Sequence, residues 1–330
     1  MNKFLVFLEQ REGIVKKTSI DTWNRVQDLA ALYGDSAVFG ILAGPVDLQQ
    51  LCASLSGKGV IYHASNEAFR LYNPGHYARL VAETLKLEAC TTIFFADTVL
   101  SRDLAPKLSL HLKASLLSGC TIFDVSKEVC VRCLRPVYSG STIASFVAER
   151  SIKIYTILSS AKLFHSISEA YPTIIPLETC CLTGSEDLFP IVRRMVMYSG
   201  RQDVTEASII VAGGRGMGGS EGFVILEQLA QLLGGAVGAS RQAVDGGWRP
   251  HFEQIGQTGK TVAPALYLAC GISGTPQHLA GLGSGSTVVA AINSDRYAPI
   301  FDVADYGIVG DVHLVLPKLL DALHEFLKRK

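Results

Sequence analysis

Apolar runs alternate with amphipathic stretches along the first half of the chain. Four runs rich in β-branched and aromatic residues predict buried strands, at residues 3–8, 37–44, 59–65 and 91–97. The stretches between and after them carry apolar residues at helical spacing and predict helices, at residues 20–34, 46–57, 75–89 and 103–119. Strands that alternate with helices in this way favour a mostly parallel sheet with helices on both faces.

The pattern loosens after Ser151, where we assign no element, and a second alternation begins beyond the polar segment 195–208. Its predicted strands are residues 208–214, 236–240, 263–271, 286–293 and 306–311. Its predicted helices are residues 221–235 and 317–330. A chain of 330 residues is also too long for one ordinary core. We therefore expect an α/β protein of two domains, 1–198 and 199–330, each a mostly parallel sheet covered by helices.

Composition narrows the class of protein. Apolar residues make up 48% of the chain and charged residues 18%, which is typical of a well-packed globular protein. The charges balance, so they indicate neither nucleic-acid binding nor attachment to an acidic membrane. No apolar run reaches the ~20 residues of a membrane helix, and residues 1–13 do not resemble a signal peptide. We expect a cytoplasmic protein without membrane insertion.

The cysteines are interpreted as small core residues in a reducing compartment. There are eight: Cys52, Cys90, Cys120, Cys130, Cys133, Cys180, Cys181 and Cys270. Cys130 and Cys133 have the CxxC spacing of redox and metal sites, but no second CxxC and no histidine lies at zinc spacing. We therefore assign this pair a structural role and predict no metal site.

Two glycine-containing stretches have the look of phosphate-binding loops. Residues 255–260 end like a Walker A loop, but Gln254 stands where its first glycine is required, which argues against a nucleoside triphosphatase. Gly214, Gly216 and Gly219 instead form a G-x-G-x-x-G pattern between a predicted strand and a predicted helix. The next strand ends at residues 240–241 (Ser-Arg), where an NAD enzyme has an acidic residue. The pattern thus predicts a Rossmann-like domain and disfavours an NAD-dependent oxidoreductase.

Five polar clusters lie at the ends of apolar runs in the second half. They are Arg215, Ser240–Arg241, Gln257–Thr258, Ser273–His278 and Asn293. Each has a structural alternative, since Ser273 can cap a helix, His278 can be a core histidine and Arg241 a surface charge. Ligands of open α/β sheets bind outside the carboxyl ends of the strands. Taken together, the clusters therefore predict one extended ligand that carries phosphates.

Several of these segments resemble a known family. VAGGRG, VGASRQAVDGGW, IGQTGKTVAPALYLACGISGTPQHLAG, VVAAIN and APIFDVADYGIVGD, within residues 208–330, resemble the flavin-binding domain of the electron transfer flavoprotein α-subunit family. In the first half, SRDLAPKLSLHLKASLLSG and RPVYSGS are similar to family motifs. Ser101 and Ser141 stand where the family has Gly and Asn, and residues 217–219 lack its usual Lys.

The resemblance implies FAD as cofactor and a heterodimer in which the first domain pairs with a β subunit. Electrons would pass from flavoprotein dehydrogenases, such as the acyl-CoA dehydrogenases of fatty acid oxidation, to a downstream redox acceptor. Such a chain is an electron carrier with no substrate of its own. Two alternatives stay open: an electron-bifurcating flavoprotein reduced through NADH and a second FAD on the β subunit, and a non-redox regulatory subunit that binds a nucleotide.

The resemblance also implies the residues that bind FAD: Arg215, Ser240, Arg241, Ile255, Gly256, Gln257, Thr258, Ser273, Gly274, Thr275, Pro276, Gln277, His278, Asn293 and Asp311. Thr258 would donate to N5 of the flavin, His278 would approach its C2 carbonyl and Arg241 would lie against the ring. Asn293 and Asp311 would reach the adenosine end. Glycines of residues 255–260 would let backbone N–H groups approach the ligand. Desolvated, Arg241 and His278 together would raise a one-electron potential by about 100 mV.

Overall fold

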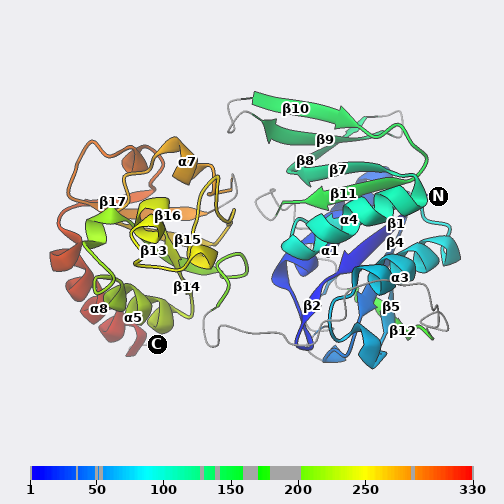
Figure 1. Cartoon of the computed structure of the whole chain (residues 1–330), viewed down its shortest axis with the longest axis horizontal. Coiled ribbons are helices and arrows are strands. Elements are labelled where there is room, and N and C mark those ends of the chain that lie inside the picture. The colour runs from blue at the N-terminus through cyan, green and yellow to red at the C-terminus, as the bar shows by residue number, and fades with distance from the viewer. Residues whose placement is uncertain are drawn as a thin grey trace. The chain divides into compact units, whose positions relative to one another are not determined.

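The computed structural model describes residues 2–34, 36–48, 51, 55–126, 130–137, 142–158, 170–178, 202–283 and 287–328 of the chain. The described residues form two compact units (Figure 1). The first contains those up to 137 and from 143 to 178, and the second contains those from 202 onward. Each unit is built on a sheet of its own, with buried apolar side chains on both faces of that sheet.

The sheet of the first unit has seven strands. Their order across the sheet is β12 (Thr173–Pro176), β5 (Val60–Ala64), β4 (Ser36–Ala43), β1 (Asn2–Leu8), β6 (Thr92–Ala96), β11 (Lys153–Ile157) and β7 (Ser115–Cys120). The pairings described between these strands are parallel. The α/β architecture is therefore confirmed, as are the four predicted strands β1, β4, β5 and β6.

Helices cover both faces of this sheet. Alternate residues of β1 point to opposite faces: Phe4 and Val6 pack with α1 (Lys17–Tyr33), whereas Leu5 and Phe7 pack with α3 (Pro74–Leu87) and α4 (Val99–Leu112). Both faces are thus apolar, which is why the central strands read as unbroken apolar runs. Of the helix predicted at 46–57, residues 49–50 and 52–54 lie outside the described residues.

Three strands of the seven-stranded sheet escaped prediction. β11 and β12 lie where no element was assigned, and β7 occupies the end of the helix predicted at 103–119. That helix is α4, and it begins earlier because Thr98 and Ser101 cap its N-terminus reciprocally. It ends at Lys113, whose left-handed conformation (φ 52°) turns the chain into β7.

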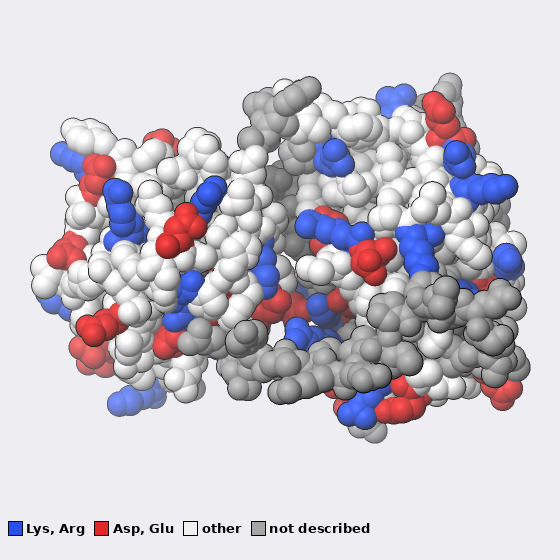
Figure 2. Space-filling model, in the orientation of Figure 1, with Lys and Arg blue, Asp and Glu red and all other residues white. Residues whose placement is uncertain are grey.

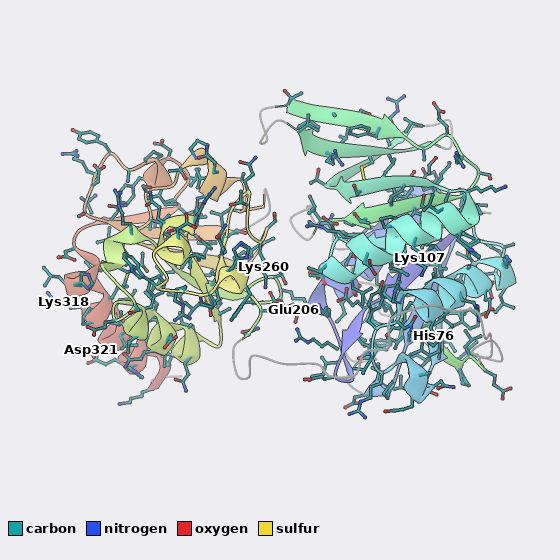
Figure 3. The ribbon with its side chains drawn as sticks, viewed as in Figure 1. His76, Lys107, Glu206, Lys260, Lys318 and Asp321 are labelled. Atoms are coloured by element: carbon teal, nitrogen blue, oxygen red, sulfur yellow. A yellow bond between two sulfur atoms is a disulfide. The ribbon has the colours of Figure 1, made fainter. Side chains whose placement is uncertain are left out.

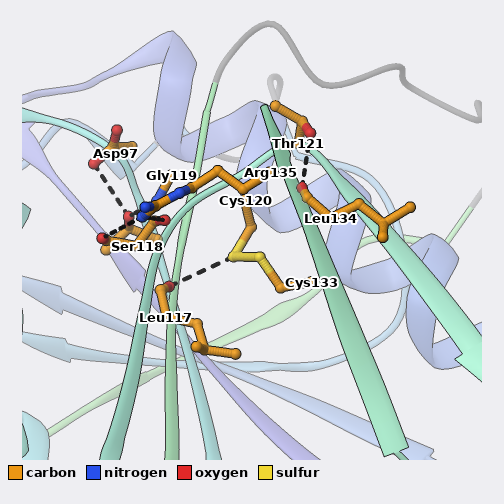
Figure 4. The surroundings of a disulfide bond; sticks show 10 residues. Asp97, Leu117, Ser118, Gly119, Cys120, Thr121, Cys133, Leu134 and Arg135 are labelled. Carbon is orange, nitrogen blue, oxygen red and sulfur yellow. Dashed lines mark hydrogen bonds between the residues drawn. A yellow bond between two sulfur atoms is a disulfide. The ribbon is translucent and has the colours of Figure 1, made fainter. Parts of the chain in front are cut away.

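A disulfide joins β7 to a smaller sheet of the first unit (Figure 4). This sheet has the order β10 (Thr142–Val147), β9 (Cys130–Val137) and β8 (Ile122–Ser126), with β8 and β9 antiparallel. The chain reverses between β8 and β9 and so brings Cys133 to Cys120, with 5.5 Å between their Cα atoms. The interpretation of these two as core thiols is therefore wrong, because spacing along the sequence does not show this reversal.

The other cysteines are described only in part. Cys90 and Cys270 are buried free thiols, as expected. Burial raises the pKa of the Cys90 thiol to about 12, which keeps it protonated. The side chain of Cys130 and the whole of Cys52, Cys180 and Cys181 lie outside the described residues.

The second unit has a five-stranded parallel sheet. Its order is β14 (Ala236–Ala239), β13 (Ile209–Gly213), β15 (Leu266–Cys270), β16 (Val288–Asn293) and β17 (Tyr306–Val309), and these confirm the five predicted strands. The helices α5 (Phe223–Leu233) and α8 (Val312–Lys328) pack on one face. Short helices, α7 (Pro276–Leu279) and η5 (Pro299–Asp302), and intervening loops cover the other face.

Helix α8 begins five residues before its predicted start at Pro317. The side chain of Asp311 accepts a hydrogen bond from the backbone N–H of His313 (2.9 Å), and its carbonyl accepts from Leu314. Asp311 therefore caps the helix, while Pro317 lies within its early turns. The prediction failed because proline was taken as the start signal, although a capping aspartate preceded it.

Charged side chains of both signs are interspersed on the visible face of each unit (Figure 2). In the part of the chain that the structure describes, no helix is both long and apolar enough to cross a membrane.

Candidate functional site

The carboxyl ends of the strands in the second unit open onto a cavity of about 620 Å³. Its walls include Arg215 after β13, Ser240 after β14, Gly271 after β15 and Asn293, the last residue of β16. β13 lies between β14 and β15, so the strand order reverses there and the crossover connections diverge. Open α/β sheets bind ligands at such a switch point, and the volume lies within the ~300–1,000 Å³ of ordinary ligand sites.

The cavity gathers thirteen of the fifteen residues that the sequence singled out, and all five polar clusters contribute to it. Pro276 and Asp311 are the two that do not line it: Pro276 is the first residue of α7, and Asp311 is engaged in capping α8. The expectation that Asp311 reaches the ligand stays a prediction, which this placement does not support, because neither Asp311 nor a residue of β17 lines the cavity. Gly216 of the G-x-G-x-x-G pattern also lines the cavity, and the lining residues that the sequence reasoning missed are Gln242, Gly271, Ile272, Ser294, Asp295 and Ala298. Most directly follow the predicted strands, and that position was the available signal.

The glycine turn after β13 is shaped by close backbone packing. A Cβ atom on Gly214 would lie 2.4 Å from the carbonyl oxygen of Gly271, and one on Gly216 would lie 2.7 Å from the Gly271 Cα. Gly271 itself has a φ of 61°, a conformation that favours glycine. Two glycines of the G-x-G-x-x-G pattern thus let the loops after β13 and β15 touch. A Cβ on Gly219, by contrast, would meet open space.

In the loop that looks like a Walker A motif, backbone N–H groups donate to carbonyls of the protein. Gly256, Gln257 and Gly259 donate to the carbonyls of Lys260, Gln277 and Gly256, at 3.2, 2.7 and 3.0 Å. The expectation that these glycines bring N–H groups to a ligand is therefore wrong for these three groups. Lys260, labelled in Figure 3, pairs with Asp203 at 2.8 Å and does not line the cavity. The loop is consequently a compact wall that presents side chains.

Thr258 is the hydroxyl that this wall presents. Its side chain is exposed in the cavity, and its Oγ1 accepts a hydrogen bond from Nε2 of Gln254 at 3.0 Å. Gln254 is buried, so its hydrogen bond holds the Thr258 oxygen in place from the protein side. Since the oxygen accepts from Gln254, the hydroxyl hydrogen is left to donate toward the cavity.

A buried arginine anchors the segment that leads into this loop. Arg249 donates from Nε and Nη2 to both carboxylate oxygens of Glu253 (2.6 and 3.0 Å) and from Nη1 to Glu227 on α5 (2.6 Å). The guanidinium also lies over the ring of Phe223. Burial alone would lower the pKa of Arg249, but the two carboxylates together raise it. The ion pair thereby ties the residues before Gln254 to the helical face of the sheet.

Two cations face the cavity, and both are exposed. Arg215 lies in the short helix η3 (Arg215–Met217), and Arg241 opens α6 (Arg241–Asp245). Nε of Arg241 lies 3.3 Å from a carboxylate oxygen of Asp245, and the two side chains are 66% and 63% exposed. The view of Arg241 as a lone, desolvated cation is thus corrected: a partner and solvent both weaken its field.

His278 contributes a neutral imidazole to the wall. Its Nε2 lies 2.8 Å from the hydroxyl of Tyr267, a core residue of β15. Burial lowers the pKa of His278 to about 4, while the backbone of Ile255 has a smaller, opposite effect without forming a hydrogen bond with Nδ1. At neutral pH the ring is therefore uncharged. It can interact with a ligand through its N–H group, but not through a positive charge.

The buried hydroxyl of Ser240 indicates that the cavity suits a polar ligand. Its Oγ is buried and has no hydrogen-bond partner among the described residues. An unsatisfied buried hydroxyl is costly, and a ligand oxygen would satisfy this one. Arg215 and Arg241 supply positive charge that suits an anionic ligand. The donors present therefore fit an elongated anionic ligand.

Asn293 shapes the far wall. Its Nδ2 donates to the carbonyl of Ile272 (2.9 Å), and its Oδ1 accepts from the N–H of Asp295 (3.0 Å). These bonds tie the loop after β16 to the loop after β15. Asn293 thus lines the cavity as expected, although its amide is already engaged with the protein.

Comparison with known proteins matches both halves of the chain. The family described as "Electron transfer flavoprotein domain" matches residues 4–170, and "Electron transfer flavoprotein FAD-binding domain" matches residues 203–283. "Electron transfer flavoprotein subunit alpha" of Thermoanaerobacterium thermosaccharolyticum is 35% identical, with 96% of each chain covered. The protein of the same name from Bacillus subtilis is 35% identical, covering 97% of this chain and 96% of its own. "Protein FixB" of Clostridium saccharobutylicum is 34% identical, covering 98% and 96%.

The matches extend over nearly the whole chain, and the FAD-binding family covers most of the loops that form the cavity. The chain belongs to the electron transfer flavoprotein family, as an α subunit.

Proposed function

We propose that the chain binds FAD in the cavity of the second unit and carries electrons between other redox proteins. The observation that supports this most strongly is the convergence of five separate polar clusters on one cavity at the switch point of the sheet. Membership of the family and the match of residues 203–283 to its FAD-binding domain add independent support.

Different parts of the wall would hold different parts of the cofactor. Arg215 and the orphaned hydroxyl of Ser240 suit the diphosphate and its linker, because both offer donors to anionic or ether oxygens. Thr258, Arg241 and His278 suit the isoalloxazine, because they supply a hydroxyl donor, a cation and a neutral ring. When bound, FAD supplies electron transfer in steps of one or two electrons.

The side chains of the cavity can tune that chemistry without taking part in bond making. A cation beside the flavin favours added negative charge and raises its potential. With Arg241 exposed and paired, its contribution is that of a screened surface charge. The hydroxyl of Thr258 adds one neutral hydrogen bond, which is a smaller effect than a desolvated charge.

We propose further that the first unit, residues 1–198, pairs with a β subunit, and that residues 199–330 present the flavin to partners. Flavoprotein dehydrogenases, such as those acting on acyl-CoA, would donate electrons, and a downstream acceptor would receive them. The names of the relatives, which are α subunits, support a partner chain.

The test is to fill the cavity with a side chain. Thr275 is exposed and lines the cavity, so Thr275→Trp obstructs it without disturbing the core. Leu314→Trp is the matched control, because Leu314 is exposed on α8 and does not line the cavity. FAD content is measured by visible absorbance of the purified heterodimer. The Thr275→Trp complex should lose FAD that the wild type and the control retain; equal FAD in all three would refute the proposed site.

A further inference from the structure

The neutral ring of His278 carries one hydrogen, on either Nδ1 or Nε2. Tyr267 and His278 are both buried, at 0% and 6% exposure, and the tyrosine hydroxyl lies 2.8 Å from Nε2. Among the described residues, Nε2 is the partner that the structure gives this hydroxyl. Nδ1, the other ring nitrogen, is buried without a hydrogen bond. The groups that lack a hydrogen-bond partner can therefore be counted for each placement of the hydrogens.

Two arrangements of hydrogens are possible for a neutral ring. In the first, Tyr267 donates to Nε2 and the ring hydrogen is on Nδ1, so one buried donor lacks a partner. In the second, Nε2 donates to the tyrosine oxygen; the tyrosine hydrogen and the Nδ1 lone pair then both lack partners. Each unsatisfied buried group costs free energy, so the count favours the first arrangement.

The surroundings favour the same arrangement. The Tyr267 hydroxyl is fully buried, and burial raises its pKa, so it keeps the hydrogen that it donates. The phenol lies on β15, a strand held by two neighbouring strands, and it is thus a rigid donor.

We propose that Tyr267 is a positioning residue that donates to Nε2 of His278 and holds the ring as the Nδ1–H tautomer. With Nε2 occupied, His278 has a donor but no acceptor left for a ligand. The complementary ligand group is an acceptor, such as a carbonyl oxygen of the flavin pyrimidine ring; this last step rests on the proposed function. Donor groups at the same place, such as the amine of an aminopyrimidine, would be disfavoured.

The tautomer is measured by two-bond ¹H–¹⁵N correlation spectra of the full chain labelled with ¹⁵N-histidine. The chain has eight histidines, and the signals missing from His278→Gln identify those of His278. The wild type should show a protonated Nδ1 and an unprotonated Nε2. A protonated Nε2 in the wild type would overturn the proposal outright.

Tyr267→Phe removes only the hydroxyl. It should let the Nε2–H form appear and weaken FAD binding about two- to tenfold, the effect of one neutral hydrogen bond. Tyr77→Phe is the control, because its hydroxyl is also buried and donates to the carbonyl of Phe69 (2.8 Å) in the first unit. The control should change neither measurement. An Nδ1–H tautomer that persists in Tyr267→Phe would refute the role of Tyr267.

Two outcomes separate this inference from the proposed function. Where Tyr267→Phe does not fold, Tyr267→Met serves as a second apolar variant, and the wild-type spectrum still decides the tautomer. A chain that shows the Nδ1–H tautomer but binds no FAD would refute the proposed function alone. A chain that binds FAD with His278 in the Nε2–H form would refute this inference alone.

Discussion

The buried, neutral His278 makes the stability of the second unit depend on pH. Its folded pKa is lowered by burial to about 4, against 6.5 for the free side chain. Between these values the unfolded chain binds more protons than the folded one, so stability falls as the pH is lowered through this window. At 1.36 kcal/mol for each pKa unit, the full loss from His278 is about 3 kcal/mol. Above pH 6.5 the contribution is complete and constant.

The assay compares the wild type with His278→Gln, because carboxylates that titrate in the same window are common to both. Urea unfolding is followed by tryptophan fluorescence in a Trp23→Phe background, which leaves Trp248 of the second unit as the reporter. The wild type should lose about 3 kcal/mol more than His278→Gln between pH 6.5 and pH 4. A stability difference that does not change with pH would show that His278 is charged or solvated in the folded state, and would refute the reasoning.

Three further predictions concern the ion pairs and the disulfide. Arg249→Met should destabilise the second unit by about 3–5 kcal/mol in urea unfolding, because it removes the guanidinium that pairs with the buried carboxylate of Glu253. Glu227→Gln, at a 40% exposed partner, should cost under about 1 kcal/mol; equal losses would contradict this. Arg241→Ala should lower the first flavin potential by at most about 40 mV in a redox titration, as expected for an exposed, paired charge; a shift near 100 mV would mean that the side chain is desolvated. Dithiothreitol should lower the stability of the first unit by about 2–4 kcal/mol and have no such effect on Cys120→Ala; an equal response in both would rule out the crosslink.

The sequence revealed the strands better than the connections between them. Strands such as β1 and β6 are buried on both faces, so their apolar runs stand out. β12 is short and exposed on three of its four residues, and it carries no comparable signal. β7 was absorbed into a helix because Ala114 and the leucines after it are also good helix formers.

The candidate site was predictable where its residues follow strands. Arg215, Ser240 and Asn293 follow directly from the rule that ligands bind at the carboxyl ends of parallel strands. Tyr267 and Gln254 were not predictable, because their importance comes from touching His278 and Thr258 in the folded chain. In sequence, Tyr267 resembles any other core residue of a strand.

Hydrogen bonds in the folded chain give some of the predicted residues a different role from the one expected. The family resemblance implied that Asp311 binds the ligand, yet its carboxylate accepts a hydrogen bond from the first turn of α8. Residues 255–260 looked like a phosphate loop, but most of their N–H groups donate to carbonyls of the protein. Hydrogen-bond competition of this kind depends on backbone geometry, which residue types alone do not specify.

The proposed function depends on FAD binding at the strand ends of the second unit. Hydrogen exchange of the heterodimer, measured by mass spectrometry with and without its flavin, tests this most directly. We predict that flavin slows exchange in peptides containing residues 240–242, 255–258, 271–275 and 277–278, which line the cavity. Slowed exchange confined to the first unit, or no difference at these residues, would contradict it.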